Sequence, residues 1–131
     1  MKYSAEQILK YMMSKYHNAC CPYGVYILDY FIAQDLLKIS EYAGHISGVI
    51  IFRKVKLSQY DDAEQMKHNP KGDCTFVVEL CADTKKDIAK LEKQMRERLG
   101  KTRSIGMHRR GKLHFYDYNK YIKMLLGKDK K

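Results

Sequence analysis

The segment Cys74–Ala82, CTFVVELCA, constrains the fold of this chain more than any other. It is an almost continuous apolar run of strand length, which is typical of a central strand covered on both faces. Thr84 follows as an N-cap, and Gly100 ends the helix that it begins. The apolar stripe of this helix is Ile88, Leu91, Met95 and Leu99. A buried strand that leads directly into an amphipathic helix predicts helices packed on a sheet.

The segments before this strand predict two helices and a hairpin. Ser4 and Gln7 form a capping box ahead of a helix over residues 5–17. The next segment, VYILDYFIAQ, is apolar on most sides and fits either a helix or a strand. LLKISEY and ISGVIIFRKVKL then favour an antiparallel hairpin across the turn Ala43-Gly44-His45.

The segments after the central helix predict two strands and a last helix. The strands are TRSIGMH and KLHFYDY, joined by Arg-Arg-Gly, and the helix follows Asn119. Between the hairpin and the central strand, QYDDAEQMKH is a short polar helix or a loop. We therefore expect an α+β fold with a mostly antiparallel central sheet and flanking helices. It should form one domain over residues 1–127, followed by a basic tail over residues 128–131.

Positive charge is the strongest signal in the composition. The 131 residues carry a formal net charge of +10. The segment from Arg96 to Lys112 has seven basic residues and one glutamate, a net charge of +6. The basic residues are Arg96, Arg98, Lys101, Arg103, Arg109, Arg110 and Lys112. This charge predicts an acidic partner, which is nucleic acid, an acidic protein or an anionic membrane surface.

Membrane-spanning and targeting segments are not expected. No apolar run approaches the roughly 18 residues of a membrane span. The N-terminal stretch MKYSAEQILKYMM has polar residues within its apolar part, unlike a signal peptide. We expect a cytoplasmic protein.

Four cysteines and one histidine are candidate reactive groups. Cys20 and Cys21 follow His17 in KYHNACCPYG, and Cys74 and Cys81 lie in the apolar run. Without C-x-x-C spacing, reduced thiols are the favoured interpretation. Cys20 or Cys21 as a thiol nucleophile is a second one. A zinc site of His17, Cys20, Cys74 and Cys81 is a third, if the fold brings the strand to the helix end; we expect no metal.

Glu79 is the one charge within the apolar run. A carboxylate is costly to bury unless it is paired or hydrogen-bonded. In a strictly alternating strand Glu79 points to a solvated face, and otherwise it is a salt-bridge partner or a site residue. His17, in the last turn of a helix, is also explained by the helix dipole.

The order of elements resembles acyltransferases of the GNAT-like type, and more closely the toxin-activating lysine acyltransferase family. The family has a histidine after its first helix and before a proline, as in MMSKYHNACCPYGVYIL. GHISGVIIFRKV resembles its hairpin strand, and FVVELCAD its central strand, with Glu79 at the place of an aspartate. RSIGMHRRGKLHFY resembles its R-x-I strand, turn and return strand, so the resemblance spans about residues 5–120.

The resemblance implies a GNAT-like domain that transfers an acyl group from a thioester to a protein lysine. His17 would be the general base and Glu79 would orient its imidazole. ADTKKDI lacks the glycine-rich turn with which acetyl-CoA enzymes hold the pyrophosphate. Acyl carrier protein, an acidic partner, is therefore the expected acyl donor rather than CoA, and no bound cofactor is expected.

Two other function classes fit the sequence. HRRGKLHFYDYNKY interleaves aromatic and basic side chains, as nucleic-acid-binding surfaces do. If this stretch is a strand, Phe115 and Tyr116 point to opposite faces and only some rings can stack. A third class is a catalytically inactive acyltransferase-like domain, including small phage-encoded ones, that serves structure or interaction. In that class His17 and Glu79 would not face each other across a cleft.

Overall fold

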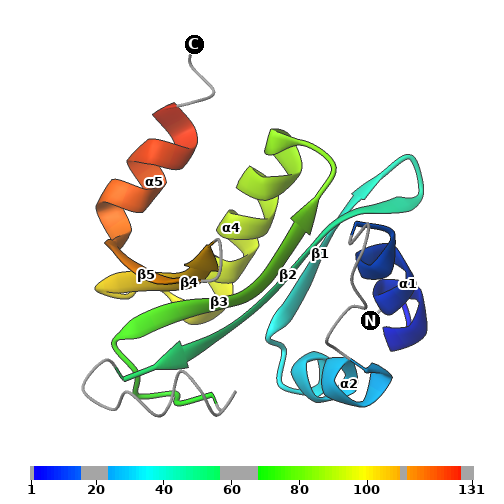
Figure 1. Cartoon of the computed structure of the whole chain (residues 1–131), viewed down its shortest axis with the longest axis horizontal. Helices are drawn as coiled ribbons and strands as arrows, with labels where there is room; N and C mark the ends of the chain where they lie inside the picture. Colours follow the sequence, from blue (N-terminus) through cyan, green and yellow to red (C-terminus); the bar gives the residue numbers. More distant parts are fainter. Residues whose placement is uncertain (1, 16–23, 57–67, 110–111, 128–131) are drawn as a thin grey trace.

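The structure is a computed structural model that describes residues 2–15, 24–56, 68–109 and 112–127 (Figure 1). Its described strands form one five-stranded sheet in the order β1-β2-β3-β4-β5. The strands are β1 (Leu37–Tyr42), β2 (His45–Val55), β3 (Cys74–Ala82), β4 (Ser104–Arg109) and β5 (Lys112–Asp117). The described helices are α1 (Ala5–Lys15), α2 (Val25–Ala33), α4 (Lys85–Leu99) and α5 (Tyr118–Gly127).

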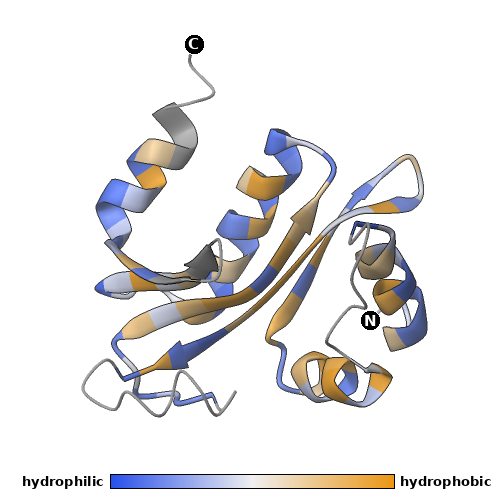
Figure 2. Ribbon diagram, in the orientation of Figure 1, coloured by the Kyte–Doolittle hydropathy of each residue, from blue (hydrophilic) through white to orange (hydrophobic). Residues whose placement is uncertain are grey.

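The sheet confirms the expected α+β class. Three neighbouring pairs of strands are antiparallel, and β3 and β4 are parallel. The parallel pair follows from the chain path, because α4 carries the chain from the end of β3 back to the start of β4. CTFVVELCA is the middle strand, as predicted, and Figure 2 shows hydrophobic residues along much of β2 and β3.

Local signals account for most element boundaries. The Ser4–Gln7 capping box is present, with Ser4 N–H donating to Gln7 Oε1 at 2.8 Å and Gln7 N–H donating to Ser4 Oγ at 3.2 Å. Thr84 caps α4, and Gly100, at φ 77°, ends it. Residues 16 and 17 of the first predicted helix lie outside the described residues.

The ambiguous segment VYILDYFIAQ forms a helix, α2, rather than a strand. Leu28 and Phe31 are fully buried on one side of it, while Tyr26 is 86% exposed on the other. The chain then turns at Asp35 (φ 56°) and enters β1. The turn Ala43-Gly44 has positive φ at both residues, which fits a tight antiparallel hairpin between β1 and β2.

The helices cover the two faces of the sheet (Figure 1). A Cβ placed on Gly48 of β2 would lie 2.9 Å from Leu91 Cδ1, so this face of β2 packs on α4. Leu91, Met95 and Leu99 of the predicted stripe are buried, while Ile88 is only half-buried. Asp87 and Glu92 of the same helix are buried too, which the apolar pattern did not predict.

Among the described residues, no helix is long and apolar enough to cross a membrane. The predicted polar stretch QYDDAEQMKH lies outside the described residues except for His68, and so does the basic tail over residues 128–131.

Candidate functional site

The parallel strands β3 and β4 separate halfway along β3. They pair from Cys74 with Ser104 to Val77 with Met107, whereas β3 continues to Ala82. The two strands run in the same direction, so the opening lies at the carboxyl end of β3. In sheets that contain parallel strands, ligands bind in the crevice beyond the carboxyl ends of the strands.

A β-bulge lies at the point where the pairing ends. On the other side of β3, Ile51 pairs with Glu79 and Phe52 pairs with Val77, which leaves Val78 as an extra residue. One extra residue moves the following side chains to the opposite face of the sheet. Strict alternation would place Glu79 on the face of Val77, but the bulge places it on the face of Ile51.

The bulge therefore turns Glu79 away from α4. Gly48 and Ala82 are cross-strand partners, and Gly48 faces Leu91 of α4. By alternation, Glu79 lies on the opposite face. There it lines a cavity of about 320 Å³ together with Leu80, Cys81, Ala82 and Lys15, from the last turn of α1.

The carboxylate of Glu79 accepts a hydrogen bond from a main-chain donor in this opening. Asp83 N–H donates to Ser47 O of β2 at 2.8 Å. Because only alternate residues of β3 bond to β2, Leu80 N–H points away from β2. That N–H donates to Glu79 Oε1 at 3.2 Å. Glu79 is half-buried, so it is neither a solvated surface group nor a deeply buried one.

Side-chain contacts join the end of α1 to the end of β3. Asp83 forms an ion pair with Lys15 and accepts a hydrogen bond from the Tyr11 hydroxyl at 2.9 Å. The paired Lys15 ammonium holds the pKa of the Asp83 carboxyl below its usual range. Burial, with a smaller contribution from Asp83, raises the pKa of Tyr11. These contacts hold the last turn of α1 beside Glu79.

The N-terminus of α4 already holds a carboxylate. Asp87 accepts hydrogen bonds from the hydroxyls of Thr84 (2.6 Å), Ser40 (2.7 Å) and Ser47 (2.7 Å). Burial opposes ionisation of Asp87, but these hydrogen bonds outweigh it and lower its pKa to about 2. The second bulge of the sheet, at Ser47, brings that hydroxyl to Asp87.

The predicted site residues are only partly within the described chain. His17, Cys20, Cys21 and Arg110 lie outside it. Glu79 lies in a cavity with the end of α1. That the His17 imidazole meets the Glu79 carboxylate stays a prediction.

The zinc set of His17, Cys20, Cys74 and Cys81 is excluded by the strand itself. Cys74 and Cys81 are seven residues apart on β3, which separates them by about 23 Å. Two ligands of one tetrahedral ion cannot be that far apart. Among the described residues, no three His, Cys, Asp or Glu side chains are grouped as metal ligands are.

Some of the basic residues predicted to bind an acidic partner instead make contacts within the chain. Arg96 approaches buried Glu92 at 3.7 Å. Arg98 bonds to Asp35 (Nε to Oδ2, 3.3 Å) and to the carbonyl of Gln34 (3.1 Å), so it joins α4 to the end of α2. Lys101 and Arg103 are exposed, and Arg109 and Lys112 lie at the facing ends of β4 and β5.

Comparisons with known proteins give a distant structural likeness only. No family model matches the chain, and no curated protein matches its sequence. A crystal structure of an acetyltransferase candidate from Staphylococcus aureus Mu50 is similar, with a TM-score of 0.42 and 16% sequence identity. The match covers 79% of this chain and 66% of that chain.

Proposed function

We propose that this chain is an acyltransferase that moves an acyl group from a carrier-bound thioester to a protein lysine. The observation that carries the proposal is the coincidence of three features on β3. Its pairing with β4 ends at Val77, its bulge lies at Val78, and the carboxylate of Glu79 is turned toward the end of α1. The resemblance to the toxin-activating lysine acyltransferases supports the same assignment.

The opening beside β3 suits the arm of an acyl donor. A phosphopantetheine arm is extended and carries amide groups, which can bond to a strand edge as a peptide does. Leu80 N–H points into this opening, and it would be the first donor to the arm or to the thioester oxygen. Because Glu79 now accepts from Leu80 N–H, its carboxylate would have to rotate away when the acyl group binds.

His17 is the proposed general base. Lys15, two residues before His17 in the sequence, lines the cavity with Glu79, and this supports the choice of His17. The lysine amine attacks the thioester carbonyl, a C–N bond forms, and the C–S bond breaks to release the thiol. His17 would take the proton that the amine loses, and Glu79 would orient and stabilise the imidazolium.

The α4 N-terminus favours a protein-borne donor over free CoA. Acetyl-CoA enzymes use a glycine-rich turn at this place to hold a pyrophosphate. Here Asp87 occupies the helix N-terminus in ionised form, and Asp83 adds a second carboxylate beside it. These charges would repel a pyrophosphate, whereas the chain's net charge of +10 suits an acidic acyl carrier protein.

The proposal is tested by thiol release. Purified protein is mixed with acyl–acyl carrier protein or with the matching acyl-CoA, and with lysine peptides, and free thiol and peptide mass are followed. We expect turnover with the carrier-bound donor and about 100-fold less with His17→Ala. His45→Ala, at an exposed histidine of β2, is the matched control and should keep full activity. Full turnover of His17→Ala would remove the proposed base.

The nucleic-acid interpretation has less support from the described rings. Tyr116 stacks on His114 with ring centroids 6.2 Å apart, while Phe115, 41% exposed, lies on the opposite face. The described part of β5 therefore offers one exposed ring rather than a row. Strong, salt-dependent binding of DNA or RNA without thiol release would favour this class over the acyltransferase. An inactive domain would show neither activity.

A further inference from the structure

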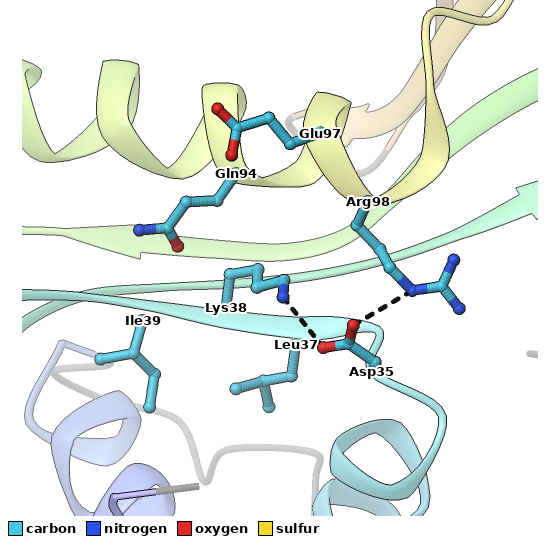
Figure 3. A pocket seen from close by; sticks show the side chains of 7 residues that line it. All are labelled: Asp35, Leu37, Lys38, Ile39, Gln94, Glu97 and Arg98. Carbon is cyan, nitrogen blue, oxygen red and sulfur yellow. Dashed lines mark hydrogen bonds and ion pairs between the residues drawn. The ribbon is translucent and has the colours of Figure 1, made fainter.

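A groove separate from the proposed acyl-transfer site runs between β1 and α4. It consists of two adjoining cavities of about 530 Å³ and 480 Å³, which share Ile39, Gln94 and Glu97 as lining residues. Figure 3 shows the first cavity, with β1 along one side and α4 along the other. Among the described strands, β1 is paired only with β2, so its outer edge faces this groove.

The outer edge of β1 offers main-chain hydrogen-bonding groups. Phe52 N–H donates to Leu36 O at 3.0 Å, which sets the alternation of the β1–β2 ladder. Lys38 and Ser40 then bond to β2, while Leu37 and Ile39 point their N–H and C=O groups outward. Such an edge is a template for another strand.

The edge lacks the usual protection by a projecting lysine. Natural edge strands are often guarded by charged side chains, lysine above all. Lys38 is instead drawn back to Asp35 by an ion pair of 2.9 Å, and Asp35 is also held by Arg98 (Figure 3). A strand can therefore approach Ile39 without displacing this lysine.

The charged side chains on the α4 side of the groove are arranged so that those of one copy would complement those of a second copy. Lys90 and Lys93 lie at one end, Glu97 lies toward the other, and Gln94 lies between them, across from the backbone of Ile39, whose side chain points to the other face of the sheet (Figure 3). None of the three charged side chains forms an ion pair with another described side chain. A twofold axis through Ile39 and Gln94 would bring Glu97 of one copy to Lys90 and Lys93 of another.

We propose that this groove is the interface of a homodimer in which β1 pairs antiparallel with β1 of a second copy. Ile39 exchanges two main-chain hydrogen bonds with its counterpart on the axis, and the two sheets become continuous. Strands lie about 4.8 Å apart and α4 is centred near β2, so the two α4 axes lie about 14 Å apart. Facing Lys and Glu side chains together span that separation.

The charge balance of the groove favours a second copy over an acidic partner. Its lining has four basic residues and three acidic ones, although the chain as a whole carries +10. The basic residues are Lys38, Lys90, Lys93 and Arg98, and the acidic ones are Asp35, Glu41 and Glu97. An acidic partner would be drawn to the more basic parts of the surface. Repulsion between two basic copies is screened beyond about 8 Å at physiological salt.

The test is a charge swap, measured by sedimentation velocity across protein concentration at physiological salt. We expect wild-type protein to dimerise. Glu97→Lys and the double variant Lys90→Glu/Lys93→Glu should each raise the dimer Kd at least tenfold. An equimolar mixture of these two variants should form a heterodimer, because the lysine introduced in one copy then faces the glutamates introduced in the other. Lys86→Glu, at an exposed site of the first turn of α4, should dimerise like wild type.

Ile39→Pro gives a second, independent variant. It removes an N–H that bonds to no partner in β2, so circular dichroism should show a folded chain while dimerisation is lost. A monomer at all concentrations would overturn the proposal. A dimer that survives both charge variants, or variants that fail to form the heterodimer, would overturn it as well.

Discussion

Asp87 shows how one side chain can fix the junction of three elements. Its carboxylate joins the first turn of α4 to Ser40 of β1 and Ser47 of β2. Protonation turns one of the two carboxylate oxygens into a donor, so it opposes the hydroxyl that donates to that oxygen, and the remaining hydrogen bonds lose their charged acceptor and become weaker. The folded state therefore favours the ionised form of Asp87 more strongly than the unfolded state does.

This predicts a pH-dependent stability. The folded pKa of Asp87, about 2, lies below its unfolded value of about 3.9. The contribution is therefore present above about pH 4 and is lost as pH falls toward 2. We expect Asp87→Asn to lower the free energy of unfolding by about 2 kcal/mol at pH 7. Urea unfolding at several pH values checks this, and a difference from wild type that stays constant down to pH 2 would contradict it.

At the scale of elements, the entry into β3 is held by close backbone packing. The turn before β3 is built on Asn69, which accepts from Gly72 N–H at 2.9 Å and from Lys71 N–H at 3.0 Å. It lies against the end of β2, where Lys54 N–H donates to His68 Nδ1 at 3.0 Å. Burial, followed by the positive charges of Arg98 and Lys54, lowers the pKa of His68, so its neutral form is the acceptor.

Gly72 is the position where this packing leaves no room. A Cβ there would lie 2.5 Å from the carbonyl oxygen of Val55 and 2.7 Å from its backbone N, and backbone cannot move as a side chain can. We expect Gly72→Ala to lower the free energy of unfolding by about 1–3 kcal/mol. Gly24→Ser is the matched control, because a Cβ at Gly24 meets nothing within 4 Å and serine suits an N-cap. Equal melting temperatures for the two variants would refute the steric argument.

At the scale of the molecule, some basic residues of the segment from Arg96 to Lys112 have intramolecular partners, whereas others are exposed. Arg96 and Arg98 have intramolecular partners, while Lys101 and Arg103 are exposed. Replacing Arg98 should therefore loosen the contact between α4 and the end of α2. Lys101 and Arg103 are the better candidates for an acidic partner, because exposed charges can meet a partner without first breaking an internal bond.

We therefore predict that Lys101→Glu/Arg103→Glu weakens binding of an acidic acyl carrier protein about tenfold at low salt, with less effect at high salt. The melting temperature should not change. The control Lys86→Glu/Lys123→Glu makes the same change in net charge at exposed sites elsewhere. Titration calorimetry at two salt concentrations separates the cases. An equal loss for both double variants would show that net charge, and not this segment, attracts the carrier.

Local sequence signals were sufficient for most of the described elements. The apolar run of β3, the Thr84 cap and the hairpin segments depend on neighbouring residues, so their positions could be predicted from spacing. The segment that became α2 could not be assigned, because an apolar run of that length suits both helix and strand. Burial of Asp87 and Glu92 was missed for a similar reason: polar residues on an amphipathic helix are expected outside, and their partners come from other elements.

The sequence by itself determined the α+β class, the order of the strands along the chain and the choice of Glu79 as an unusual acid. Only the tertiary structure decided which face Glu79 occupies, because the bulge at Val78 arises from the register between β2 and β3. The separation of β3 from β4 likewise depends on strands that the sequence places about thirty residues apart. Register and divergence are properties of strand pairs, and no spacing within one segment encodes them.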